Sequence, residues 1–185
     1  MKIRLLAFVV ILGCGAIAIG WVYERSLREP AQKTALVIPD DIDYFLTNMT
    51  YRALNSAGTL NFRLQTPRLE HYPHNDVSSL EVPSMRIETD TDPWLVDSKR
   101  GEYQHANNLM HLTREVVMQR QGSTPMQVFT ESIRFEPDRE LVTADSDILM
   151  VSPQARINAE YAVFDLAEKV YHFTRARTVY QNEDG

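Results

Sequence analysis

The sequence contains one cysteine and no cluster of basic residues, and each absence excludes a class of protein. Cys14 lies within an apolar stretch, so no disulfide can form in the remainder of the chain, which must be held by its hydrophobic core alone. The formal net charge is −6 at pH 7, and the lysines and arginines are scattered. Without a basic block, a nucleic acid is not an expected partner.

Catalytic and cofactor motifs are also missing. No Gly-x-Ser-x-Gly elbow, phosphate-binding loop or dinucleotide-binding glycine pattern occurs. His71 and His74 have a spacing that could begin a metal site on a helix, but Tyr72-Pro73 between them predicts a strand end or turn. No cysteine or third ligand is evident near them in the sequence. We therefore expect no enzyme, no metal and no cofactor, and we interpret the histidines as ordinary surface residues.

The sequence does contain one long apolar stretch, residues 5–23, with no charged side chain. This is close to the roughly 20 residues that a helix needs to cross about 30 Å of hydrocarbon. A cleaved signal peptide and a lipoprotein signal at Cys14 are the alternatives. The stretch continues past both Cys14 and the small residues Ala16-Ile17-Ala18, which argues against each of them. We predict an uncleaved transmembrane anchor at residues 1–23.

The charges that flank this stretch are nearly balanced, so the positive-inside rule does not set its orientation. A very short N-terminal stub before a large C-terminal domain favours a cytoplasmic N-terminus. In a bacterium, this predicts a single-pass inner-membrane protein with its main domain in the periplasm. Ala16 and Gly20 are four residues apart and would share a helix face against which another helix can pack closely.

The remainder of the chain has the alternation typical of β-strands. Residues 24–41 mix charges and prolines without periodicity and are predicted to be a linker, whereas residues 42–182 are predicted to form one β-domain. Leu60, Phe62 and Leu64 alternate with polar residues. The preceding segment also alternates, and we place Phe45, Met49 and Tyr51 on one of its faces. The turn signal at residues 55–58 predicts that these two segments form a hairpin.

A weak internal repeat bears on the architecture. Residues 109–118, 141–150 and 170–180 each contain bulky residues, a short polar break and bulky residues again, and each follows a polar turn. Such a repeat predicts stacked β-layers rather than a closed Greek-key core. Stacking would leave the first strand, 44–53, and the last, 174–180, as edges on which another strand could dock.

The most specific motif lies in residues 51–72. A Gly58 turn is followed by Leu60-x-Phe62-Arg63-Leu64 and then by Leu69-Glu70-His71-Tyr72, and Val82-Pro83 comes next. In this order, the motifs resemble those of the LptC family of bacterial lipopolysaccharide-export proteins, which have a G-x-L-x-Y-R-L … E-Y-Y pattern and a Q-P segment. Residues 152–161 depart from the family because they lack its glycines, so that a positive-φ position there would fall to Asn158 or be absent.

The resemblance implies an all-β fold, namely an open, twisted β-jellyroll of stacked antiparallel strands (OstA-like), preceded by one transmembrane helix. It also implies a bridge function. Lipopolysaccharide would arrive from the inner-membrane complex of LptF, LptG and the LptB ATPase, which would contact the N-terminal edge and the transmembrane helix. The C-terminal edge would pass it to LptA. The alternative is a membrane-anchored scaffold that binds only proteins through its strand edges.

An apolar interior would suit the lipid A acyl chains, because each exposed CH₂ group costs about 0.8 kcal/mol in water. We expect the lipid-binding positions to be inward-facing residues of the strands: Phe45, Met49, Tyr51, Leu60, Phe62, Leu64, Leu80, Val82, Met85, Ile87, Met110, Leu112, Ile133, Phe135 and Ile148. The same residues would form the core of any β-domain, and Met49 and Leu80 are the strongest candidates. At the C-terminal edge, the expected LptA contacts are Val170, Phe173, Ala176 and Tyr180.

Overall fold

The computed structural model describes residues 41–55, 57–122 and 124–180 of the chain. The predicted anchor, including Ala16 and Gly20, and the predicted linker up to residue 40 lie outside these residues. Within the described part, no helix has the length and apolar character required to span a membrane. The domain boundaries at residues 23, 41 and 182 stay predictions.

The described residues form fourteen strands that pair antiparallel throughout, with two short 3₁₀ turns and no α-helix. The 3₁₀ turns are η1 (His105–Asn107) and η2 (Pro137–Arg139). The strands are β1 Tyr44–Leu54, β2 Leu60–Tyr72, β3 Val77–Glu81, β4 Ser84–Ile87, β5 Trp94–Asp97, β6 Arg100–Gln104, β7 Leu109–Arg120, β8 Met126–Glu136, β9 Leu141–Ala144, β10 Ile148–Val151, β11 Ala155–Ala159, β12 Tyr161–Asp165, β13 Val170–Thr174 and β14 Arg177–Tyr180.

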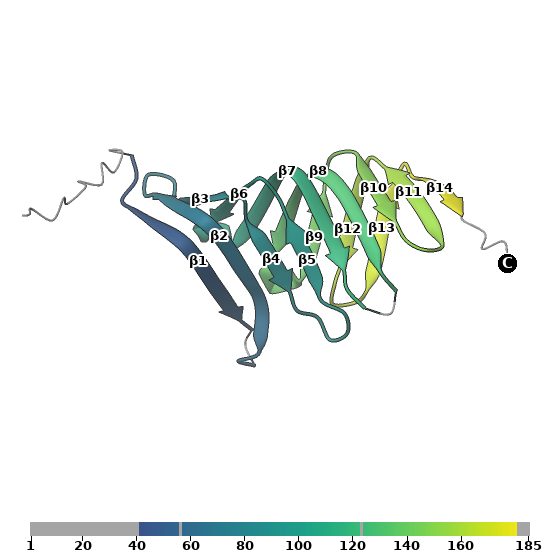
Figure 1. Cartoon of the computed structure of the whole chain (residues 1–185), viewed down its shortest axis with the longest axis horizontal. Helices are drawn as coiled ribbons and strands as arrows, with labels where there is room; N and C mark the ends of the chain where they lie inside the picture. The colour runs from purple at the N-terminus through teal and green to yellow at the C-terminus, as the bar shows by residue number, and fades with distance from the viewer. Residues whose placement is uncertain (1–40, 56, 123, 181–185) are drawn as a thin grey trace, which may run out of the picture. The chain divides into compact units, whose positions relative to one another are not determined.

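Long strands belong to two layers at once. The first part of β2, Phe62–Gln65, pairs with β4, and its last part, Arg68–Tyr72, pairs with β3. In the same way, β7 pairs with β6 through Leu109–Thr113 and with β5 through Val117–Arg120. The sheet therefore folds over on itself, and Figure 1 shows the strands arranged between β1 at one end and β14 at the other. The predicted all-β, jellyroll-like fold is confirmed.

The fold-over occurs at residues with a left-handed backbone. Asn48 has φ 50°, Val82 has φ 42°, Arg114 has φ 66° and Arg175 has φ 52°, and each lies where a strand, or a pair of consecutive strands, passes between layers. Such a residue can reverse the alternation of inward and outward side chains. In a continuous strand, for example, Leu80 and Val82 would lie on the same face. Here Leu80 is fully buried and Val82 is exposed. The prediction that Val82 faces the interior is therefore wrong.

The predicted hairpin and repeat are both present. β1 and β2 pair around a turn in which the Asn55 Oδ1 accepts hydrogen bonds from the backbone N–H groups of Ala57 and Thr59. The three repeats correspond to β7, β9–β10 and β13–β14. A left-handed residue ends the turn before each of them, and Asp76 does the same before β3. The β3–β4 segment is thus a further unit of the repeat, which the sequence comparison missed. The left-handed residues that end the turns before the four units are Asp76, Asn108, Glu140 and Lys169.

The segment without glycines forms an ordinary turn. The Ser152 backbone N–H donates to the Ala155 carbonyl oxygen at 2.9 Å, and the Ser152 hydroxyl oxygen accepts from the Ala155 N–H at 3.1 Å. No residue between 152 and 161 has a positive φ, and Asn158 lies within β11. Of the two possibilities that the sequence left open, a positive φ at Asn158 or no positive φ at all, the second therefore holds. The turn requires no left-handed residue.

Between the layers, the interior is filled by interlocking side chains. Phe62 from β2 meets Phe135 from β8 edge to face, with 5.7 Å between ring centroids, and Trp94 from β5 meets Phe164 from β12 at 6.1 Å. These four rings are at most 2% exposed. Because such pairs join strands that are distant in the sequence, they hold the two layers together.

Phe135 provides a test of this core. Replacing it with alanine (Phe135→Ala) should lower the free energy of unfolding by about 3–5 kcal/mol, since the ring is fully buried against Phe62. Phe129→Ala, in the same strand but with its ring partly exposed, should lower it by roughly 1 kcal/mol or less. Urea unfolding followed by circular dichroism measures both values. Equal losses would contradict the layered core described here.

Candidate functional site

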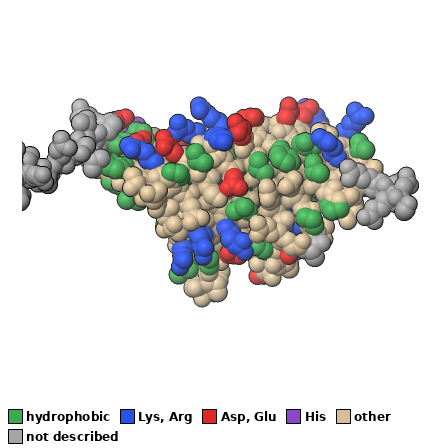
Figure 2. All heavy atoms as spheres, viewed as in Figure 1, with side chains coloured by type: hydrophobic (Ala, Val, Ile, Leu, Met, Phe, Trp, Pro, Cys, Tyr) green, Lys and Arg blue, Asp and Glu red, His purple; other side chains and the backbone are tan. Residues whose placement is uncertain are grey.

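An apolar pocket of about 330 Å³ lies at the β1 end of the domain. Within the residues that the structure describes, β1 pairs only with β2, so none of their strands covers its inward side chains. Tyr44, Leu46 and Tyr51 are consequently 41%, 44% and 47% exposed, and Figure 2 shows hydrophobic side chains at the surface where β1 begins. The lining consists of Tyr44, Leu46, Met49, Tyr51, Phe62, Leu64, Leu69, Ser78, Leu80, Tyr103, His105 and Met110.

The left-handed Asn48 decides which side chains of β1 reach the pocket. Tyr44 and Leu46 face it before Asn48, and Met49 and Tyr51 face it afterwards, because the alternation shifts by one residue at Asn48. The prediction that Phe45 shares a face with Met49 is therefore wrong. The Phe45 ring lies outside the pocket, 5.1 Å from the guanidinium carbon of Arg68.

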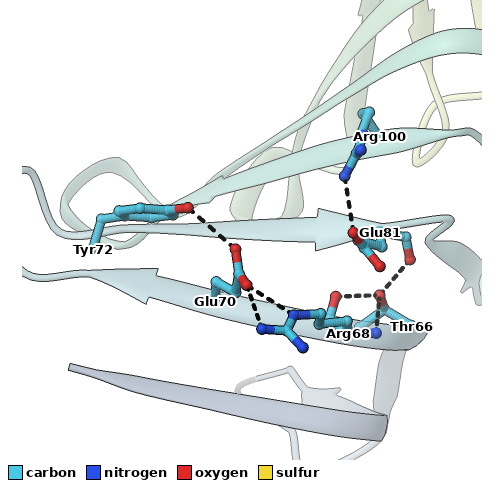
Figure 3. A network of polar contacts seen from close by, with 6 residues as sticks. All are labelled: Thr66, Arg68, Glu70, Tyr72, Glu81 and Arg100. Carbon is cyan, nitrogen blue, oxygen red and sulfur yellow. Dashed lines mark hydrogen bonds and ion pairs between the residues drawn. The ribbon is translucent and has the colours of Figure 1, made fainter. Parts of the chain in front are cut away.

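A polar network runs along β2 and joins it to β3 (Figure 3). Thr66 Oγ1 lies 2.6 Å from the Glu81 carbonyl oxygen and 2.8 Å from the Arg68 carbonyl oxygen. Arg68 donates to Glu70 through Nε at 2.8 Å and Nη2 at 2.7 Å, and the Tyr72 hydroxyl donates to the same carboxylate at 3.2 Å. Burial, followed by this last bond, raises the pKa of Tyr72. None of the residues in this network lines the pocket.

The structure separates the residues predicted to bind lipid into three groups. Those that line the pocket are Met49, Tyr51, Phe62, Leu64, Leu80 and Met110. Those that are buried in the filled core, away from the pocket, are Met85, Ile87, Leu112, Ile133, Phe135 and Ile148. Those that do neither are Phe45, Leu60 and Val82, of which Leu60 is half-buried at the start of β2. The pocket therefore occupies only the β1 end of the interior.

Several lining residues were not predicted: Tyr44, Leu46, Leu69, Ser78, Tyr103 and His105. Asn48 is a residue type that tolerates left-handed backbone, which was a signal that could have identified Tyr44 and Leu46. Tyr103 donates its hydroxyl to Asn108 Oδ1 at 2.7 Å, and burial raises the pKa of this phenol, so it lines the pocket as a neutral group. No pattern in the sequence indicated His105.

A cluster of charged and aromatic groups lies beside the pocket. His71 is only 8% exposed. Its Nδ1 lies 2.6 Å from Asp43 Oδ1, its Nε2 lies 3.3 Å from Asp76 Oδ1, and its ring stacks on Tyr44 with 4.7 Å between centroids. The His105 ring is 5.3 Å away. The interpretation of His71 as an ordinary surface histidine is therefore wrong.

Hydrogen bonding sets the charge of this cluster. The bond to Asp43 raises the pKa of His71 against the opposing effect of burial, and Asp76 adds to the rise. The same bond lowers the pKa of Asp43. When His71 is protonated, an imidazolium lies between two carboxylates.

The opposite end of the domain carries two free edges. Within the described residues, β13 pairs only with β12, and β14 pairs only with β11. Val170, Ala176 and Tyr180 are exposed there, whereas Phe173 packs against Phe164 with 5.7 Å between ring centroids. The last segment comprises two short strands joined at the left-handed Arg175, rather than one strand over residues 174–180.

Comparison with known proteins agrees with this fold. The chain matches the family described as "Lipopolysaccharide-assembly, LptC-related" over residues 8–181. It is also similar to the crystal structure of LptH from Pseudomonas aeruginosa, described as the LptA-homologous periplasmic component of the lipopolysaccharide transport device. The TM-score is 0.55 at 9% identity, over 65% of this chain and 95% of the other. No curated protein matches the chain significantly. At such low identity, the structural likeness concerns the fold alone.

The histidine cluster predicts a pH dependence of stability. The pKa of His71 is raised above its ordinary 6.5, so the contribution of this group is fully present below pH 6.5 and is lost as the pH rises through the folded-state value. The contribution of Asp43 is present above its ordinary 3.8 and is lost on acidification. In the presence of EDTA, the unfolding temperature should therefore fall as the pH rises above 6.5. Asp43→Asn should weaken this fall and His74→Gln should leave it unchanged, whereas an identical fall in both variants would contradict the assignment.

Proposed function

The chain belongs to the LptC-related family of lipopolysaccharide-assembly proteins, and on this premise we propose that its β-domain receives lipopolysaccharide acyl chains in the pocket at the β1 end. A role in lipopolysaccharide transport follows from the family, and the protein is a transport component rather than an enzyme. The observation that supports acyl-chain binding most directly is the inward face of β1. Its apolar side chains are large, and nothing in the described part of the domain covers them.

The chemistry of the pocket fits an acyl chain. Apart from Ser78 and His105, every lining residue is hydrophobic, and the two polar residues are adjacent to the histidine cluster. Burying methylene groups against such a surface stabilises the complex by about 0.8 kcal/mol for each CH₂. The polar sugar portion would remain in water. Met49 and Met110 add flexible side chains that can adapt to acyl chains of different shape.

Lipid that moves beyond the pocket would have to separate the layers. Phe62 lines the pocket and also contacts Phe135 of the filled core. We therefore assign the pocket residues to the initial binding step. The buried residues that would line the path only after the layers part are Met85, Ile87, Leu112, Ile133, Phe135 and Ile148.

We propose that the two ends of the domain have different partners. The β1 edge and the N-terminal anchor would contact the ATP-driven inner-membrane complex, with Ala16 and Gly20 as the helix-packing face. Val170, Phe173, Ala176 and Tyr180 would contact a periplasmic protein of the LptA type. The free edges of β13 and β14 support this second contact, because an unpaired strand can extend the sheet of a partner. The domain would accordingly lie in the periplasm, anchored to the inner membrane.

Site-specific photo-crosslinking tests the lipid site. A photoreactive amino acid at Leu46 or Met49 should capture lipopolysaccharide in cells, because both side chains line the pocket. Phe45 lies in the same strand and Val82 lies just after β3, but neither side chain lines the pocket. Capture at these two positions should be at least about tenfold weaker. Adducts are detected by immunoblotting for lipopolysaccharide. Capture of proteins alone at Leu46 and Met49 would favour the protein-binding scaffold instead.

The same method tests the C-terminal edge. Crosslinkers at Val170, Phe173, Ala176 and Tyr180 should capture the LptA-type partner, with the strongest signal at the exposed Val170 and Tyr180. Tyr161 is a suitable control, since it is exposed but lies in β12, which is paired on both sides. Silence at all four positions, or an equal signal at Tyr161, would count against this edge.

A further inference from the structure

Three side chains with metal-binding donor atoms meet at the end of the pocket. One donor atom each from His71, Asp76 and His105 lies within 4.8 Å of the other two. They come from three parts of the chain: His71 from β2, Asp76 from the turn before β3, and His105 from η1. The sequence-based reasoning considered His71 with His74, but His74 instead packs its ring edge to face with Tyr72, 6.2 Å away.

The backbone fixes these groups relative to one another. The His105 N–H donates to the Asp76 carbonyl oxygen at 3.2 Å, which ties η1 to the turn that carries Asp76. Asp76 has φ 52°, as the last residue of that turn. Ser78, which is 1% exposed, lies 2.9 Å from His105 through its hydroxyl oxygen. The segments that carry Asp76 and His105 are therefore held together by their backbones, although both side chains are exposed.

Asp43 supplies the feature that distinguishes a metal site from a group of polar residues. Its Oδ1 lies 2.6 Å from His71 Nδ1, on the opposite side of the ring from Asp76. Histidine ligands commonly donate their second ring N–H to a carboxylate in this way, which directs the lone pair of the other nitrogen at the metal. We propose that His71 Nε2, Asp76 and His105 bind a divalent transition-metal ion of the Zn²⁺ class, with Asp43 orienting His71.

The donor set and the spacing both fit this class of ion. Two imidazoles and one carboxylate are ligands that Zn²⁺ accepts, with a fourth position for water, whereas Mg²⁺ and Ca²⁺ prefer oxygen ligands alone. Two ligands at about 2.0–2.1 Å from a tetrahedral ion lie about 3.3 Å apart. The distance between His71 Nε2 and Asp76 Oδ1 is 3.3 Å. His105 would have to move toward the other two ligands to complete the site. It is exposed and lies on the short 3₁₀ turn η1.

A proton is the competing occupant of His71 Nε2. An imidazolium held by Asp43 and Asp76 satisfies the same two contacts and does not involve His105, whose Nε2 lies 2.9 Å from the Ser78 hydroxyl. A metal ion requires His105 as a ligand. A substitution at His105 therefore discriminates between the two occupants. His74 serves as the matched control, because it is two residues from Asp76 and packs against Tyr72 instead of joining the cluster.

Bound metal would join the start of β1 to the rest of the pocket end. Asp43 directly precedes β1, and its contact to His71 would then support a ligand of the bound ion. The edge strand would then be held at its first residues by more than its pairing with β2. Because Ser78 and His105 also line the pocket, the ion would lie at the rim of the apolar cavity.

Calorimetric titration with ZnCl₂ tests the proposal. The full-length chain is stripped with EDTA and dialysed into a non-ionic detergent buffer at pH 7.5. We expect one Zn²⁺ per chain. His105→Ala should weaken binding at least tenfold, Asp43→Asn should weaken it about 10–100-fold, and His74→Ala should leave it within twofold. A thousandfold excess of Mg²⁺ should not compete.

Absence of Zn²⁺ binding, or equal affinity in His105→Ala and the wild type, would overturn the proposal. Circular dichroism shows whether each variant is folded. If His105→Ala is unfolded, X-ray absorption at the zinc edge of the wild-type complex decides the question. Two imidazole neighbours would support the site, and one or none would refute it.

Discussion

The structure depends on the ability of a strand to leave one layer and join the other without turning its apolar side chains outward. A regular strand cannot do this, because its side chains alternate strictly while its backbone bends. Left-handed residues such as Asn48 and Val82, and the bulge at Arg114-Glu115 in β7, supply the extra rotation. Each unit of the repeat therefore contributes to both layers, and the interior between them is continuous from β2 to β13.

The core and the pocket arise from the same pattern and differ only in their neighbours. Met85, Leu112 and Ile133 each lie in a strand that is paired on both sides, and they are fully buried. Tyr44 and Leu46 follow the same inward rule but lie in an edge strand. An edge in a two-layered stack thus exposes apolar side chains as well as unpaired backbone. Most edges are protected by charges or prolines, whereas β1 presents aromatic and aliphatic groups.

The sequence was sufficient for features that are local or periodic. Alternation in Leu60–Leu64, the Gly58 turn and the repeat at 109–118 and 141–150 predicted the strands and their stacking, because neighbouring residues determine them. Phe45 and Val82 were placed on the wrong face because one backbone dihedral angle outweighs the period of two. The surroundings of His71 could not be predicted, since Asp43 and His105 reach it only through the folded topology.

If the pocket binds lipid as proposed, its location on an edge strand links lipid binding to docking. A strand from a partner with the same two-layered fold could pair with the outer edge of β1. It would place its inward side chains opposite Tyr44 and Leu46. The exposed side of the pocket would then be closed by the partner, and the two interiors would become one apolar passage. A closed core behind a short open pocket is therefore compatible with the proposed transfer, in which the domain would not need a permanent channel of its own. It needs an end that is apolar only where a partner or a lipid will cover it.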